Sequence, residues 1–241
     1  MPSTSRDPWP LPPIDFALEG STTALLVIDM QYHNAHPDYG VGRAMAAASP
    51  GYGAYFYGRL RTTVIPNICD LIDEWRRTGR RIVYVALGAE FDDLSDLAPT
   101  ARERSRRRQE VTGVATLYPK SSFEYQILPE IAPRTGELVV NKTTLGAFSS
   151  TTLEQTLRNL GIRNLVVTGV VTSVCVESTA RDAVDRGFAT VLVSDACAAW
   201  DQESQEATLR SFRRYFGRVA TTSDVFAETR ARAGSVGDTN G

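Results

Sequence analysis

A cysteine follows a predicted buried strand at the start of a predicted helix. Residues 165–168 form a short aliphatic and β-branched run, which is typical of a strand covered on both faces in a parallel sheet. Thr172 is a suitable helix N-cap, which puts Cys175 at the third helical position, where backbone NH groups have no partner within the helix. Gly169 would let the backbone approach a ligand closely.

These NH groups and the positive end of the helix dipole favour an anion. We therefore expect the Cys175 thiol to ionise more easily than a free cysteine and to act as a nucleophile, with the same NH groups holding the oxyanion that it generates. The alternative is that Cys175 only packs in the core as a small apolar side chain.

Two further reactive residues follow predicted strands. Residues 24–28 are all apolar and end at Asp29, and residues 137–141 form another strand that ends at Lys142. Ligands bind at the carboxyl edge of open parallel sheets, where Asp29, Lys142 and Cys175 would then meet. Taken singly, Asp29 is more often a turn or cap residue and Lys142 a surface charge, but the three together point to a catalytic site.

Strands and helices alternate along the chain. The predicted strands cover residues 24–28, 81–87, 137–141, 164–168, 189–193 and 218–221, and the predicted helices cover 59–78, 151–160, 172–186, 201–215 and the residues from 224 onward. The alternation predicts an α/β fold with a doubly wound, mostly parallel sheet of about six strands and helices on both faces. We expect an N-terminal arm over residues 1–22, a single domain over 23–232 and a disordered tail over 233–241.

Composition narrows the functional class. With 26 basic and 28 acidic residues among 241, the net charge of −2 favours neither nucleic acid nor an acidic membrane as a partner. Three scattered cysteines make no disulfide framework or zinc motif, and no long apolar run or basic-apolar leader is present. We therefore expect a cytosolic protein.

Two irregular segments separate these elements. Residues 32–58 are rich in Tyr, Gly and Ala and are expected to be a lid, a subunit interface or a well-packed surface loop. An arginine-rich stretch follows the second strand and is expected to be a solvated face or a subunit contact; it contains Arg102, Arg104, Arg106, Arg107 and Arg108.

The chain resembles the isochorismatase-like cysteine hydrolase superfamily over residues 22–225. The resemblance rests on three motifs: Ile28-Asp29-Met30-Gln31, Lys142 followed by Gly146 and Phe148, and Gly169-Val-Val-Thr-Ser-Val-Cys175-Val. It implies the isochorismatase-like hydrolase fold, a catalytic triad of Asp29, Lys142 and Cys175, and hydrolysis of a small amide through a thioester with ammonia release. It also implies a cis peptide between Val170 and Val171, with the backbone NH groups of Val171 and Cys175 forming the oxyanion hole.

Departures from relatives narrow the substrate. Nicotinamidases of this superfamily bind a metal through Asp-x-His after the second strand, where this chain has Ala-Leu-Gly-Ala-Glu, so neither a metal nor another cofactor is expected. The arginine-rich span is similar to that of relatives that act on ureido compounds such as N-carbamoylsarcosine, biuret or ureidoacrylate. The candidate pocket residues are Tyr32, Glu90 and Phe148. Relatives are often dimers or tetramers, so we expect a homo-oligomer.

Two other functions remain open at this point. An isochorismatase-type vinyl-ether hydrolase would use Asp29 to protonate its substrate and would not need Cys175. A catalytically silent family member would serve as a binding or assembly partner. The intact triad argues against the second alternative.

Overall fold

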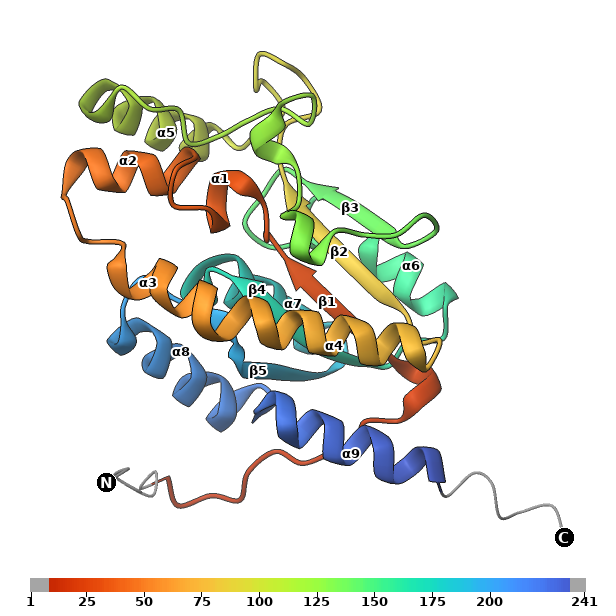
Figure 1. Ribbon diagram of the computed structural model, residues 1–241. Helices are drawn as coiled ribbons and strands as arrows, with labels where there is room; N and C mark the ends of the chain where they lie inside the picture. The colour runs from red at the N-terminus through yellow and green to blue at the C-terminus, as the bar shows by residue number, and fades with distance from the viewer. Residues whose placement is uncertain (1–8, 235–241) are drawn as a thin grey trace, which may run out of the picture.

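A six-stranded, fully parallel sheet forms the centre of the molecule in the computed structural model, which describes residues 9–234, with the backbone alone for 231–234 (Figure 1). The strands stand in the order β3-β2-β1-β4-β5-β6. The order of the strands along the chain reverses between β1 and β4, which is the switch point where ligands bind in doubly wound folds. The strands are β1 (Thr23–Ile28), β2 (Ile82–Leu87), β3 (Leu138–Lys142), β4 (Asn164–Val170), β5 (Ala189–Ala198) and β6 (Arg218–Ala220).

Helices cover both faces of the sheet (Figure 1). One core contains residues of α3, α4 and α9, and the other contains residues of α6, α7 and α8. The helices are α1 (Tyr32–Ala35), α2 (Gly40–Ala48), α3 (Ala54–Arg59), α4 (Ile65–Arg77), α5 (Pro99–Thr112), α6 (Leu153–Asn159), α7 (Glu177–Asp185), α8 (Gln202–Tyr215) and α9 (Thr222–Gly234). The predicted α/β class and two-sided sheet are confirmed.

The central strand β1 explains why the apolar runs are continuous. Leu25 and Val27 pack into the first core, whereas Leu26 and Ile28 pack into the second. Because successive side chains of a strand point to opposite faces, a strand covered on both faces needs apolar residues at every position. All six residues of β1 are accordingly buried.

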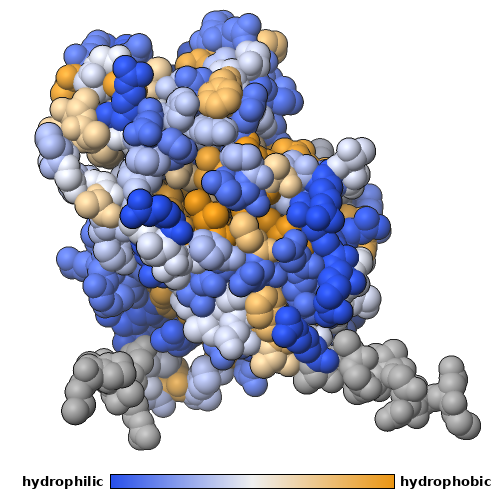
Figure 2. Space-filling view, viewed as in Figure 1, coloured by the Kyte–Doolittle hydropathy of each residue, from blue (hydrophilic) through white to orange (hydrophobic). Residues whose placement is uncertain are grey.

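The connection between β1 and α4 is more ordered than the sequence suggested. Residues 32–58 form α1, α2 and most of α3, and a π-helical turn over Leu60–Val64 joins α3 to α4. The arginine-rich span forms α5, which contacts α2. Together these helices make a lobe beyond the carboxyl ends of the strands (Figure 1), and Figure 2 shows mainly hydrophilic side chains over it.

The described part of the N-terminal arm packs against the domain beside α9. In the arm, Leu18 is fully buried and its backbone NH donates to Glu228 of α9. Helix α9 ends at Gly234, and the rest of the tail predicted over residues 233–241 lies outside the described part of the chain. None of the helices among the described residues is long and apolar enough to cross a membrane.

Candidate active site

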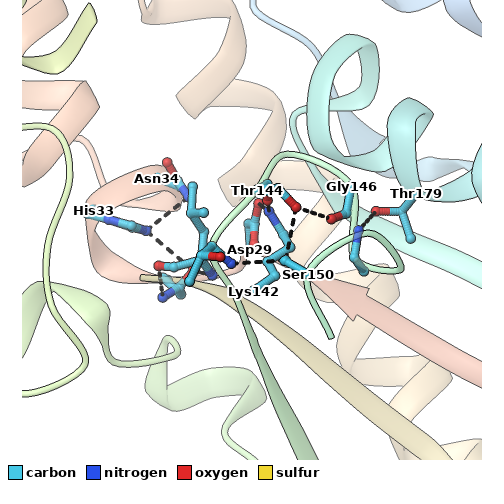
Figure 3. Close-up of polar contacts among 12 residues, drawn as sticks. Asp29, His33, Asn34, Lys142, Thr144, Gly146, Ser150 and Thr179 are labelled. Atoms are coloured by element: carbon cyan, nitrogen blue, oxygen red, sulfur yellow. Dashed lines mark hydrogen bonds and ion pairs between the residues drawn. The ribbon is translucent and has the colours of Figure 1, made fainter. Parts of the chain in front are cut away.

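Asp29, Lys142 and Cys175 come together at the carboxyl edge of the sheet. Asp29 directly follows β1, Lys142 is the last residue of β3, and Cys175 lies in the π-helical turn Thr172–Val176 that joins β4 to α7. Lys142 Nζ lies 3.0 Å from Asp29 Oδ2, and both side chains are almost completely buried (Figure 3). The ammonium also donates to the carbonyl oxygen of Thr144 at 3.1 Å. The Cys175 thiol interacts with both charged groups.

A close approach between β4 and β1 shapes this edge. Gly169 has a φ of +108°, and a Cβ atom at this position would lie 2.1 Å from the carbonyl oxygen of Ile28. Glycine is therefore needed here so that β4 can approach the backbone of β1. The sequence had suggested instead that this glycine allows a close approach to a ligand. Asp29 follows at once with a φ of +52°, a conformation that aspartate tolerates better than most residues.

The turn that carries Cys175 begins one residue earlier than predicted. Val171, not Thr172, is its N-cap, and the buried hydroxyl of Thr172 has no hydrogen-bond partner among the described residues. The peptide bond between Val170 and Val171 is cis. Val171 and Cys175 line the same cavity.

Burial and mutual attraction set the charges of the triad. Burial raises the pKa of Asp29, although Lys142 and Cys175 oppose this effect. Burial alone would lower the pKa of Lys142, but the attraction of Asp29 and Cys175 prevails and raises it. Burial and the negative charge of Asp29 raise the pKa of Cys175 to about 12, against the influence of Lys142.

The expectation that Cys175 ionises easily is therefore wrong. The helix start does not compensate for burial beside a carboxylate. The thiol is neutral at physiological pH and has a buried carboxylate beside it that can accept its proton.

A polar network on the other side of Asp29 holds the side-chain amide of Asn34 at the cavity (Figure 3). The side chain of Gln31 accepts from the NH of Leu87 at 2.8 Å and donates to the carbonyl of Tyr125 at 2.7 Å. Burial lowers the pKa of His33 to about 3, so its ring is neutral, and its Nε2 lies 3.0 Å from Nδ2 of Asn34. With the Asn34 nitrogen engaged in this way, its oxygen is the atom left to accept from a molecule in the cavity.

The cavity beside the triad has a volume of about 150 Å³. An apolar cavity of this size can hold a molecule as large as benzene, which restricts the site to small substrates. Its walls come from the strand ends, α1, α2, α5 and the segments after α5 and β5. They consist of Asp29, Asn34, Val41, Met45, Leu87, Arg104, Arg108, Thr116, Leu117, Leu145, Val171, Val174, Cys175 and Trp200.

Comparisons with known proteins identify the family of the chain. The Isochorismatase domain model matches residues 23–224. The chain belongs to the isochorismatase family. It is 32% identical to the ureidoacrylate amidohydrolase RutB of Stutzerimonas stutzeri, with 97% of this chain and 94% of that protein covered. It is 33% identical to RutB of Rhizobium rhizogenes, with coverages of 90% and 87%.

Two solved structures share the fold. A cysteine hydrolase from Pseudomonas syringae pv. phaseolicola superimposes with a TM-score of 0.75 at 22% identity, over 92% of this chain and 99% of that one. N-carbamoylsarcosine amidase from Thermoplasma acidophilum superimposes with a TM-score of 0.61 at 25% identity, over 83% of this chain and 96% of that one.

The three residues proposed from the sequence as pocket residues do not line the cavity of this family member. Tyr32 lines a separate hollow between α1 and α3, where Figure 2 shows apolar side chains. It is two residues from Asn34 on the single turn of α1, so the two side chains point to different sides. Glu90 is exposed and pairs with Lys120. Phe148 is buried in the second core.

Sequence reasoning missed most of the cavity wall. Val41, Met45 and Trp200 are apolar residues in segments without a recognisable pattern, and they approach Cys175 only through the fold. Arg104 and Arg108 could have been recognised in the sequence as a pair without an ion-pair partner on their own helix. They are four residues apart and have no acidic residue three or four positions away.

The described residues contain no group of three or more His, Cys, Asp or Glu side chains placed to hold a metal ion. Near the cavity, the nitrogen of His33 that faces Asn34 is engaged in a hydrogen bond. The carboxylate, the ammonium and the thiol of the triad are reactive groups that lie together at the edge of the sheet.

Proposed function

We propose that this chain is a cysteine-dependent amidohydrolase that cleaves a C–N bond of a small ureide or carbamoyl compound and releases ammonia. The observation that carries the proposal is the buried ion pair of Lys142 and Asp29 beside the Cys175 thiol, at the wall of a small cavity. The activities named for the related RutB proteins and for N-carbamoylsarcosine amidase support this substrate class.

The proposed reaction has two halves. Asp29 accepts the thiol proton as Cys175 Sγ bonds to the substrate carbonyl carbon, and the oxyanion is held by the backbone NH groups of Val171 and Cys175. The C–N bond then breaks, and the proton passes from Asp29 to the leaving nitrogen. Water activated by Asp29 attacks the thioester, or the thiocarbamate formed from a ureide, and frees the thiol. Lys142 stabilises the negative charges throughout.

The pKa directions support coupled proton transfer. A thiol with a pKa of about 12 is a weak nucleophile until its proton is removed, so a base must act during the attack. Burial raises the pKa of Asp29, which makes this carboxylate a better proton acceptor than an exposed one. Because the two groups interact strongly, they titrate as a pair.

We further propose that the enzyme works in the cytosol as a homo-oligomer, a dimer or tetramer, and needs no metal or other cofactor. A reducing compartment suits the chemistry, since Cys69, Cys175 and Cys197 are all free. No nucleic acid or membrane is proposed as a partner, in keeping with the net charge of −2.

Mass spectrometry of the intact protein tests the mechanism. Wild type, Cys175→Ser and Asp29→Asn would each be mixed with a panel of ureides and carboxamides, quenched in acid and weighed, with ammonia release followed in parallel. We expect a substrate-dependent adduct and ammonia from wild type only.

Two results would contradict the proposal. Full activity of Cys175→Ser, measured as hydrolysis of a vinyl ether, would favour the ether hydrolase in which Asp29 protonates the substrate. Absence of both adduct and ammonia across the panel would favour a catalytically silent binding or assembly protein.

A further inference from the structure

Helix α5 carries two kinds of arginine. Arg106 and Arg107 point to the outside and both form ion pairs with Glu103 of the same helix. Arg104 and Arg108 form no ion pair with any carboxylate in the described part of the chain, although they belong to the same run.

The two unpaired arginines line the cavity that contains the Cys175 thiol. They are four residues apart and therefore occupy the same face of α5. Burial and the repulsion of Arg104 lower the pKa of Arg108. Arg108 is half-buried and Arg104 is exposed, and neither has a carboxylate partner among the described residues, so the pair offers two positive charges to an anion in the cavity.

The fold keeps this arginine pair in place. α5 packs against α2, which contributes Val41 and Met45 to the same cavity. The buried hydroxyl of Ser105 lies 3.0 Å from the hydroxyl of Thr116, another cavity residue, and so ties α5 to the segment that follows it. The arginines therefore stand on a helix that is anchored to the rest of the lobe on two sides.

The cavity is polar on two separate walls. The sheet edge supplies the triad, whereas α5, on the side away from the sheet, supplies the guanidinium groups (Figure 1). The wall between them is largely apolar, with Val41, Leu145 and Val174 among its residues. Asp29 and Lys142, which act on the Cys175 thiol, lie at the edge of the sheet, whereas the arginines lie on α5. The arginine pair therefore acts on a part of the substrate away from the reacting carbonyl.

We propose that Arg104 and Arg108 bind a carboxylate of the substrate, and that the substrate is a small ureido acid with its carbamoyl group at Cys175. The inference rests on the proposed amidohydrolase function and names its substrate class. Guanidinium groups bind carboxylates through two parallel hydrogen bonds, which an apolar wall strengthens by excluding water. A carboxylate and a carbamoyl group joined by two or three atoms match a cavity of about 150 Å³.

Two probes of equal length separate recognition of the anion from catalysis. The anionic probe is 3-ureidopropionate and the neutral probe is propylurea, and ammonia release is measured for both. Arg104→Gln and Arg108→Gln should each raise KM for 3-ureidopropionate roughly 10- to 100-fold, because each removes a hydrogen bond to a charged group. Both variants should lower kcat/KM for 3-ureidopropionate far more than kcat/KM for propylurea, and most of the loss should appear in KM rather than in kcat, since the arginines stand on α5 and the thiol at the edge of the sheet. Arg106→Gln and Arg107→Gln, on the exposed side of the same helix, are matched controls and should behave as wild type with both probes.

A binding measurement makes the inference testable without turnover. Calorimetric titration of 3-ureidopropionate into Cys175→Ser should show binding that weakens by a similar factor when Arg104→Gln or Arg108→Gln is added. Absence of binding to Cys175→Ser would overturn the inference, as would equal losses with both probes or equal losses in the Arg106→Gln control. If propylurea and 3-ureidopropionate are hydrolysed equally well by wild type and by the double variant Arg104→Gln/Arg108→Gln, the anion site is refuted while the amidohydrolase function stands. If 3-ureidopropionate binds through the arginines but no ureide or carboxamide is turned over, the proposed function fails and the anion site stands.

Discussion

Replacing Lys142 with methionine should destabilise the protein strongly at neutral pH. Lys142 and Asp29 are almost completely buried and lie 3.0 Å apart. Methionine keeps much of the lysine volume but leaves the carboxylate of Asp29 buried without a cation. Removing one partner of a buried ion pair costs about 3–5 kcal/mol of the free energy of unfolding. For a domain of this size, the midpoint of thermal unfolding should fall by roughly 6–20 °C.

The loss should depend on pH with a defined sign. Burial already raises the pKa of Asp29 above 3.8, and removal of the opposing Lys142 should raise it further. A carboxyl group with a higher pKa in the folded state contributes stability that is full below its unfolded pKa and is lost as the pH rises through the folded pKa. The free energy of unfolding of Lys142→Met should therefore fall by about 1.4 kcal/mol per pH unit within that window.

Urea unfolding at pH 5 and pH 8 measures this effect in wild type, Lys142→Met, Asp29→Asn and the double variant. The double variant should be more stable than Lys142→Met alone at pH 8, because positions 29 and 142 then hold no buried charge. Lys120→Met is a suitable control, since the ion pair of Lys120 with Glu90 is about half exposed and its loss should cost no more than about 1 kcal/mol. The reasoning would be refuted if the losses in free energy of unfolding of the two single variants added up to that of the double variant. It would also be refuted if Lys142→Met lost equal stability at pH 5 and pH 8.

Three further predictions follow from the site and its supports. Because the pKa of Cys175 is raised to about 12, its alkylation by iodoacetamide in a Cys69→Ser background should accelerate about tenfold per pH unit from pH 7 to 9, and a plateau near neutral pH would reveal a preformed thiolate. Gly169→Ala should lower the free energy of unfolding by about 2–5 kcal/mol, since its Cβ would lie 2.1 Å from a carbonyl oxygen of β1. Gly161 also has a positive φ, but its Cβ would meet no atom within 4 Å, so Gly161→Ala should cost only about 1 kcal/mol. Similar urea midpoints for the two variants would contradict this reasoning. Burial lowers the pKa of His33 from 6.5 to about 3, so its contribution to the free energy of unfolding is full above pH 6.5 and falls by about 2–3 kcal/mol at pH 4.5. In urea unfolding, His33→Gln should therefore lose less stability than wild type between pH 7 and pH 4.5. An equal loss in the two proteins would exclude His33 as the source of the pH dependence.

The strands could be predicted because a two-sided parallel sheet imposes a simple pattern. Residues 24–28 are apolar throughout, and each of them packs in one of the two cores. The placement of Asp29 and Lys142 follows from the same rule, since both come at the ends of such runs and the ends of parallel strands share one edge.

The lobe over the cavity could not be predicted in the same way. α1 is a single turn and α2 is short and rich in small residues, so their positions depend on contacts with distant segments rather than on a local pattern. α5 buries only Ser105 among its residues and therefore has no apolar stripe that would mark a helix. The raised pKa of Cys175 could not be predicted from the sequence, because the burial of the thiol beside Asp29 is a property of the assembled fold.

The order of the strands explains why a lysine supplies the cation of the triad. β2 lies between β3 and β1, so the two strands that carry Lys142 and Asp29 are two strand spacings, about 10 Å, apart. A long, flexible side chain is needed to cross the end of β2. Gln31 makes this crossing possible, because its amide takes up the NH and the carbonyl of Leu87 at the end of β2. The strand end is then satisfied without water, and the ion pair above it can remain buried.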